Sequence, residues 1–267
     1  MSLFHLFLVA VIQGITEFLP VSSSGHLILL PNLSSFEDQG QVIDVAVHAG
    51  TLGAVILYFW REVKLAILGI PRLLTGRLDT PGAKLAFLLV IATLPVVGVG
   101  LVLHATGASD LLRSVAVIGW AMIVFGIVLY WADQRGSTVK QSADWTLRDA
   151  IVMGLWQAVA LIPGTSRSGI TITAGRLLGY DRESAARIAM LMSIPTITAS
   201  ALLLGAEVVA TADMQMARDG AIAAAMSFVA AFAALAMMMR LLQSVSFTPY
   251  VIYRIVLGVV LLAIAYA

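Results

Sequence analysis

Six long apolar stretches constrain the fold of this chain more than any other feature. A bilayer core of about 30 Å is crossed by about 20 apolar helical residues. Stretches of roughly that length cover residues 42–60, 84–104, 114–132, 187–206, 220–239 and 250–266. Hydrophobic residues make up 60% of the 267 residues and charged residues only 12%, whereas soluble domains carry about 25% charge. The sequence therefore predicts an all-α polytopic membrane protein with six transmembrane helices, and it excludes a soluble globular domain.

Charge and cysteine content exclude further classes. The 16 basic and 15 acidic residues leave a net charge of +1, so no basic excess indicates a nucleic-acid partner. The chain has no cysteine, which excludes a disulfide framework, a thiolate metal site and a cysteine nucleophile. Residues 1–7 carry no Lys or Arg, and Glu17 interrupts the first apolar stretch. We therefore expect no cleaved secretory signal.

Four shorter apolar segments form two pairs, residues 3–19 with 26–31 and residues 148–162 with 169–178. A turn rich in Pro, Gly and Ser separates the members of each pair. The second segment of each pair is too short to cross a bilayer alone. Non-helical backbone at membrane depth survives only when it is buried in protein or lines a watery cavity. The two pairs are therefore predicted to be re-entrant helical hairpins.

The order of one hairpin followed by three spans occurs twice within a single membrane domain. Repeat 1 covers residues 1–132, a polar linker residues 133–147, and repeat 2 residues 148–267. An offset of 144 residues aligns four pairs of identical residues: Gln13 with Gln157, Ser22 with Ser166, Ser24 with Ser168, and Gly25 with Gly169. Because each half has an odd number of spans, we expect an inverted-topology repeat whose hairpin tips meet near the bilayer midplane.

Basic residues gather on one predicted face of the membrane. That face holds Arg61, Lys64, Arg72, Arg77, Lys84, Arg135, Lys140, Arg148, Arg176, Arg182, Arg187 and Arg240. The opposite face holds Arg113 and Arg218, and the assignment of Arg254 to it stays open. The positive-inside rule makes the first face cytoplasmic and places both termini outside.

The first hairpin turn carries polar groups that are costly inside a membrane. An unpaired carboxylate such as Glu17 costs about 2.5–3.5 kcal/mol on insertion scales, and Gln13 lies one helical turn before it. After Pro20 the chain continues with Ser22, Ser23, Ser24, Gly25 and His26 at the start of the next apolar segment. Hydroxyls beside the amides of a helix start predict an anion site. A polar pair joining two helices, or an ordinary serine cap, is the alternative.

The second hairpin turn repeats this pattern and adds a cation. It contains Thr165, Ser166, Arg167, Ser168 and Gly169, with Thr171 in the following turn of helix. The Arg167 guanidinium suits bidentate contact with a phosphate, or it pairs with Glu17 to hold the two tips together. A nucleophile, a proton carrier and a cationic clamp are the parts of a phosphoryl-transfer site. At this depth a lipid phosphate is the natural substrate.

Two segments, QGITEFLPVSSSGHL at residues 13–27 and PGTSRSG at residues 163–169, resemble the signatures of a known family. This is the bacitracin-resistance family of integral membrane undecaprenyl-diphosphate phosphatases, and the resemblance extends over the whole chain, including DVAVHAGT at residues 44–51. It implies six spans with two re-entrant hairpins in the bacterial cytoplasmic (inner) membrane. It also implies dephosphorylation of undecaprenyl diphosphate to undecaprenyl phosphate, which recycles the carrier lipid of peptidoglycan synthesis and gives bacitracin resistance.

The resemblance also implies roles for individual residues. It places Gln13, Glu17, Ser22, Ser23, Ser24, Gly25, His26, Ser166, Arg167, Ser168 and Thr171 in the site. From these, with the turn residues Thr165 and Gly169, we take as candidate catalytic residues Glu17, Ser23, His26 and Arg167. The candidate substrate-binding residues are Gln13, Ser22, Ser24, Gly25, Thr165, Ser166, Ser168, Gly169 and Thr171. The family is described as using a divalent cation, Mg²⁺ or Ca²⁺, which Glu17 and Gln13 would hold here. Gln13 departs from members with two carboxylates at this motif and so weakens a two-acid metal site.

The mechanism that we expect starts with attack of Ser23 on the terminal phosphorus. Arg167 and the turn amides stabilise the phosphoryl oxygens, and His26 or Glu17 moves the proton; in a competing version His26 is the nucleophile. The expected partners are the polyprenyl diphosphate and membrane lipid, and a homodimer stays open.

Other functions compete with phosphatase activity. A transporter or flippase of an anionic polyprenyl phosphate shares the plan of paired broken helices, but it has less need of serines beside His26 and Glu17. An intramembrane serine protease usually presents its histidine on a later span, whereas every histidine here precedes the linker. A structural scaffold leaves the polar turns unexplained. His5 and His104 are expected at the membrane interface, and His48 either lines the cavity or pairs with Asp44.

Overall fold

The computed structural model describes residues 2–28, 40–108, 112, 114–209 and 214–267, and the described chain is entirely helical apart from turns and one isolated bridge. The helices are α1 (Leu3–Phe18), α2 (Ser23–Leu27), α4 (Gly40–Tyr58), α5 (Trp60–Leu74), α6 (Pro81–Thr106), α8 (Val115–Arg135), α9 (Leu147–Val159), α10 (Arg167–Leu177), α11 (Arg182–Val209), α12 (Met214–Leu241) and α13 (Thr248–Tyr266), with a 3₁₀ turn at Ser142–Asp144. The predicted all-α class is confirmed. The end of the expected segment 26–31, residues 29–31, lies outside the described residues.

The six predicted spans are confirmed as helices that are long and apolar enough to cross a membrane. They are α4, α6, α8, the stretch Arg182–Gly205 of α11, α12 and α13. Local sequence sets where they begin and end. The Thr80 hydroxyl accepts a hydrogen bond from the Ala83 amide at the start of α6, and Gly107 ends that helix with a φ of 68°. The Ser114 hydroxyl caps α8 in the same way. The chain is therefore a multi-pass membrane protein.

Helix α5 was not predicted, because residues 61–83 carry too many charges to read as a span. Its residues Val63, Ala66 and Gly69 are buried at a spacing of three, while Arg61 and Lys64 are exposed. The buried side packs closely on α6, since a Cβ atom on Gly69 would collide with the backbone at the start of that helix. The charged residues hid an amphipathic helix, which the three-residue spacing of Val63, Ala66 and Gly69 could have indicated.

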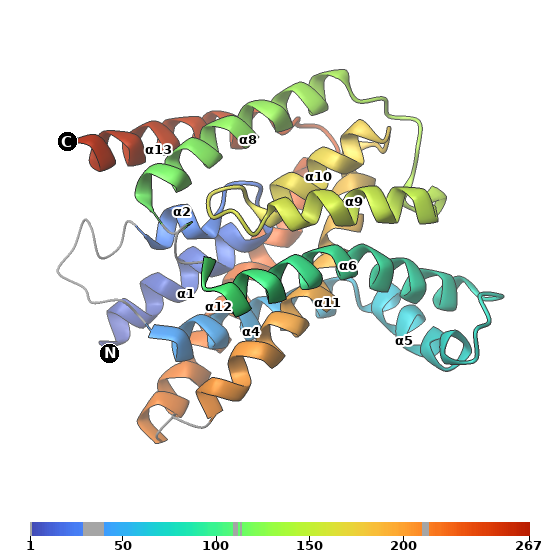
Figure 1. Ribbon diagram of the computed structural model, residues 1–267, viewed down its shortest axis with the longest axis horizontal. Coiled ribbons are helices and arrows are strands. Elements are labelled where there is room, and N and C mark those ends of the chain that lie inside the picture. Colours follow the sequence, from blue (N-terminus) through green and yellow to red (C-terminus); the bar gives the residue numbers. More distant parts are fainter. Residues whose placement is uncertain (1, 29–39, 109–111, 113, 210–213) are drawn as a thin grey trace.

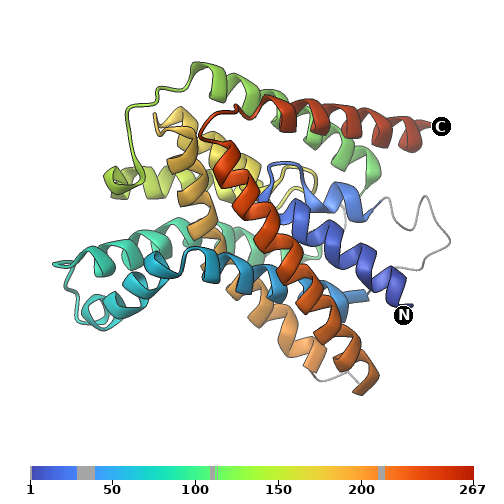
Figure 2. The ribbon, with the colours of Figure 1, turned by 180° about the vertical axis from the view of Figure 1, so that it is seen from behind.

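The two helix pairs approach each other from opposite ends of the molecule. The N-terminus, where α1 begins, lies at the same end as the C-terminus, whereas α5 and the segment joining α8 to α9 lie at the other end (Figure 1). The turns after α1 and α9 meet near the middle (Figure 1). Seen from behind, α12 crosses the molecule beside α1 and α4 (Figure 2). Small residues permit this crossing: Gly14 of α1 lies against Ala230 and the backbone of Ser227.

A buried ion cluster holds the end of the molecule opposite the termini. Asp133, at the end of α8, accepts hydrogen bonds from Arg176 Nε at 3.1 Å and Arg182 Nε at 2.8 Å. Its second oxygen accepts from the Phe247 amide at 3.2 Å. One carboxylate thereby links the ends of α8 and α10 to the starts of α11 and α13.

The base of α9 is fixed by a second polar contact at the same end. Tyr180 donates its hydroxyl to Asp149 in the first turn of α9 at 2.7 Å. Burial, together with the Asp149 carboxylate, raises the pKa of the Tyr180 phenol well above its usual range. Tyr180 therefore stays a neutral donor and ties the turn after α10 to the start of α9.

Candidate active site

The turns between α1 and α2 and between α9 and α10 share an unusual backbone. Ser22 has φ 69° and ψ 105°, and Ser166 has φ 68° and ψ 113°. They are the two non-glycine residues with positive φ in the described chain, and they lie 144 residues apart. Each serine hydroxyl contacts that of the serine two residues later, at 3.0 Å for Ser24 and 3.1 Å for Ser168. Strained backbone of this kind clusters at functional sites.

Each turn also binds the backbone of the other. The amide of Gly164, in the second turn, donates to Ser24 Oγ of the first at 3.1 Å. Ser168 Oγ, in the second turn, donates to the carbonyl of Leu19 in the first at 2.9 Å. Gly164 itself has a φ of 90° and packs against the backbone of Ile118, a position that only glycine fits. Reciprocal hydrogen bonds thus join the two turns.

A buried arginine on α13 supports both turns from behind. Arg254 is fully buried and donates to the carbonyls of Thr165 at 2.7 Å and Gly164 at 3.1 Å. The sequence left open whether Arg254 belongs to the outer face, and the structure instead places its side chain inside the protein. A basic residue within an apolar span was the signal that could have placed it.

Glu17 and Arg167 meet where the two turns join. Arg167 Nη2 lies 2.8 Å from Glu17 Oε1, and Gln13 Nε2 donates to Glu17 Oε2 at 2.7 Å. Arg167 Nη1 is buried and has no hydrogen-bond partner among the described residues. The two alternatives for Arg167 are therefore compatible, because Glu17 engages one side of the guanidinium fork and leaves the other for a ligand.

His48 is the histidine that faces this network, a role that the sequence left open. Its Nδ1 lies 2.7 Å from the backbone carbonyl of Asp44, so Nδ1 carries the proton. Its Nε2 lies 3.1 Å from Gln13 Nε2 and 3.7 Å from Glu17 Oε2. The Gln13 amide thus bridges a carboxylate and an imidazole. His48 lines the cavity, one of the two alternatives for it, and its contact with Asp44 goes to the main-chain carbonyl, which a residue of any type would supply.

These groups line a cavity of about 460 Å³. Its polar wall includes Glu17, Ser22, Ser23, Ser24, Ser166 and Arg167 from the predicted set, together with Thr16, Asp44 and His48. Its other wall is largely apolar and comes from α6 and α11, with Val96, Val97, Leu101, Ile197, Leu203 and Leu204. The cavity therefore offers a polar end for a charged group beside a hydrophobic wall.

The other predicted binding residues lie behind this wall and support it. Thr165 offers its carbonyl to Arg254, and Thr171 Oγ1 donates to the carbonyl of Arg167 at 2.7 Å within α10. Gly25 packs against Met122, and a Cβ atom on Gly169 would lie 2.7 Å from Arg254 Nη1. Ser168 and Gln13 are fully buried and act through the hydrogen bonds already given. Direct substrate contact by these residues stays a prediction.

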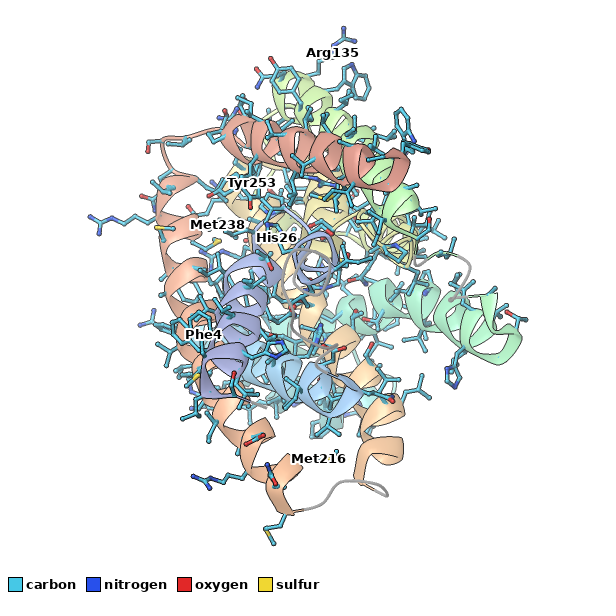
Figure 3. The ribbon with its side chains drawn as sticks, turned by 90° about the vertical axis from the view of Figure 1, so that its left-hand side faces the viewer. Phe4, His26, Arg135, Met216, Met238 and Tyr253 are labelled. Atoms are coloured by element: carbon cyan, nitrogen blue, oxygen red, sulfur yellow. The ribbon has the colours of Figure 1, made fainter. Side chains whose placement is uncertain are left out.

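His26 points away from the cavity. Its Nε2 lies 2.7 Å from the Tyr253 hydroxyl, and the two rings stack at 5.5 Å (Figure 3). Its Nδ1 lies 2.7 Å from the carbonyl of Ser22, which can only accept. Both ring nitrogens are therefore engaged on the far side of the turn. The catalytic role of His26 stays a prediction. Ser23 and Ser24, in the first turn of α2, line the cavity.

Glu17 is the cavity-lining carboxylate on which binding of a divalent cation beside the two turns would depend. The described residues contain no group of three His, Asp or Glu side chains placed to hold a metal ion. Both Glu17 oxygens are engaged, and Gln13 turns its nitrogen, not its oxygen, toward Glu17. A diphosphate can supply most oxygens of a Mg²⁺ ion that is held by one or two carboxylates. Glu17 fits that single role. Metal binding by Gln13, whose Oε1 is buried without a hydrogen-bond partner among the described residues, stays a prediction.

The fold and the cavity define an integral membrane protein with a partly polar cavity between the turns after α1 and α9 and the helices α6 and α11. The family model described as bacitracin resistance protein BacA matches residues 6–260. Proteins named undecaprenyl-diphosphatase are similar over the full length of both chains: 78% identical in Jannaschia sp., 70% in Ruegeria pomeroyi and 67% in Dinoroseobacter shibae. The chain belongs to the BacA family, as the two signature segments predicted.

Proposed function

We propose that this protein removes the terminal phosphate of undecaprenyl diphosphate and so regenerates undecaprenyl phosphate for peptidoglycan synthesis. The observation that carries the proposal is the cavity, in which an unpartnered Arg167 nitrogen and the Ser23 turn face an apolar wall. The diphosphate would occupy the polar end, and the prenyl chain would follow α6 and α11. The names of the relatives support the same substrate.

The proposed reaction proceeds through Ser23. Its Oγ bonds to the terminal phosphorus while the bridging P–O bond breaks, and that electron pair leaves with undecaprenyl phosphate. The serine proton passes to a base on the cavity wall, and water then cleaves the phosphoserine. Arg167 stabilises the charge on the phosphoryl oxygens. The position of Ser23 on the cavity, and the engagement of both His26 nitrogens elsewhere, favour Ser23 over His26 as the nucleophile.

The proposal includes the placement in the membrane. The two pairs, α1–α2 and α9–α10, would be re-entrant hairpins of an inverted-topology repeat, since they start at opposite ends and share their turn geometry. The end with α5 and the linker carries most of the basic residues, so it would face the cytoplasm across the inner membrane, with both termini outside.

A divalent cation, Mg²⁺ or Ca²⁺, is part of the proposal. Glu17 would be its protein ligand, and the substrate phosphates would supply further oxygens. The ion would neutralise phosphate charge during the transfer. Glu17 would also keep its contact with Arg167, which orients the guanidinium toward the phosphate.

A flippase of an anionic polyprenyl phosphate is the second candidate, favoured by the meeting of two broken helix pairs in the middle of the molecule. Phosphate release from undecaprenyl diphosphate by purified protein in detergent separates the two. We expect release by the wild type, strong loss in Arg167→Ala, and full release in Arg240→Ala, which removes an exposed arginine at the end of α12. No release by folded wild type with Mg²⁺ or Ca²⁺ would reject the phosphatase and favour the flippase.

A further inference from the structure

Arg254 is a buried arginine whose partners are carbonyl groups. No acidic residue in the described part of the chain forms an ion pair with it, and its guanidinium donates to Thr165, Gly164 and, at 3.4 Å, Pro20. Two of these carbonyls belong to the second turn and one to the first. Placing an unpaired cation at this depth is costly, so such residues usually serve the function of the site.

The hydrogen bond from Arg254 to the Thr165 carbonyl also determines the direction of the next amide, that of Ser166. In a planar trans peptide the C=O and the following N–H point in opposite directions. The Thr165 carbonyl points toward Arg254, which is outside the cavity wall, so the Ser166 N–H points away from Arg254. Ser166 lines the cavity, and no described residue accepts a hydrogen bond from its amide. Ser166 has a φ of 68°, a strained conformation that Ser22 shares in the first turn.

We propose that Arg254 is a positioning residue, which holds the Thr165–Ser166 peptide so that the Ser166 amide donates to the terminal phosphate of the substrate. The inference rests on the proposed function and deepens it. The amide would act beside Arg167 Nη1, the other donor on this wall without a partner among the described residues. Two donors of this kind, held before the reaction starts, favour the charge that develops on the phosphoryl oxygens.

The first turn offers a matched comparison. There Gly25 packs against the thioether of Met122 on α8, whereas in the second turn Gly169 packs against Arg254 on α13. Met122 is fully buried but offers no hydrogen-bond donor. Met122→Ala therefore removes packing behind one turn without releasing a carbonyl, and it is the control for Arg254→Ala.

The test compares kcat and KM for undecaprenyl diphosphate in the wild type, Arg254→Ala and Met122→Ala, with thermal unfolding as the measure of folding. We expect Arg254→Ala to lower kcat about 100-fold, the loss typical of an oxyanion donor. KM should change little, because the apolar wall that would bind the prenyl chain comes from α6 and α11. Added guanidinium chloride should restore part of kcat in Arg254→Ala, and ammonium chloride at equal ionic strength should not.

Several outcomes would overturn the proposal. They are a folded Arg254→Ala with wild-type kcat, an equal loss in Met122→Ala, and a failure of guanidinium to restore activity. If Arg254→Ala does not fold, Arg254→Lys replaces the planar fork by a single ammonium and is expected to lose kcat; wild-type kcat there also overturns the proposal. Orthovanadate binding, measured by calorimetry, should weaken in Arg254→Ala, and it reports on the amide even if the wild type releases no phosphate.

Discussion

The two turns at the centre of the molecule share a backbone but not their chemistry. Ser22 and Ser166 adopt the same strained conformation, and each begins a helix. The next residue is Ser23 in the first turn and Arg167 in the second. The position equivalent to Glu17 by the 144-residue offset is Leu161. The first turn thus carries the proposed nucleophile Ser23 and follows the carboxylate Glu17, whereas the second carries the cation Arg167. In the proposed mechanism neither turn holds a complete site.

The paired glutamines give the largest expected difference between the halves. Gln13 bridges Glu17 and His48, whereas Gln157 donates to the Ala92 carbonyl of α6 at 3.2 Å and accepts from the Thr196 hydroxyl of α11 at 3.3 Å. Gln13→Ala should lower phosphate release about 10- to 100-fold, as loss of a partner behind a functional group does. Gln157→Ala should lower the unfolding temperature while activity of the folded protein is retained. Equal activity loss in both variants would contradict this division.

Removing the reciprocal hydrogen bonds between the turns should have the second largest effect, and that effect is on stability. Ser24→Ala leaves the Gly164 amide unpaired and should cost about 1–3 kcal/mol of stability. Ser168→Ala removes one of the two hydrogen bonds that the Leu19 carbonyl accepts, the other coming from the Val21 amide at 2.7 Å, and should cost about 0.5–1.5 kcal/mol. Both costs are measured by thermal unfolding in detergent. Ser244→Ala, which removes an exposed hydroxyl after α12, is the control and should change nothing. Unchanged unfolding of Ser24→Ala and Ser168→Ala would show that these bonds do not hold the turns together.

The two strained serines give the smallest difference. Glycine relieves positive φ at either position. Ser166 Oγ caps α10 by accepting from the Gly169 amide at 3.1 Å, whereas the Ser22 side chain makes no capping bond to α2. Replacing a capping serine by glycine costs about a few tenths of a kcal/mol. Ser22→Gly should therefore unfold at a higher temperature than Ser166→Gly. The reverse order would mean that the cap adds nothing.

The sequence predicted the spans and both turns, because bilayer thickness sets helix length and because Pro, Gly and Ser break helices at fixed places. Helix α5 was not predicted, because its charged residues lower its mean hydropathy below that of a span. Arg254 could have been recognised as a charge within an apolar span, but the partners of Arg254 and of His26 could not be predicted, because they belong to elements far away in sequence. Arg254 lies 89, 90 and 234 residues from the carbonyls of Thr165, Gly164 and Pro20, and Tyr253 lies 227 residues from His26.

A double-mutant measurement of single-turnover phosphate release tests most directly whether the two turns form one site. Ser23→Ala and Arg167→Ala should each lower the rate about 10³-fold or more, and residues that act as a unit on one phosphate are not additive. The double variant should then be no slower than the slower single variant. Losses that multiply in the double variant, or substantial turnover in Ser23→Ala, would contradict a shared site with Ser23 as its nucleophile.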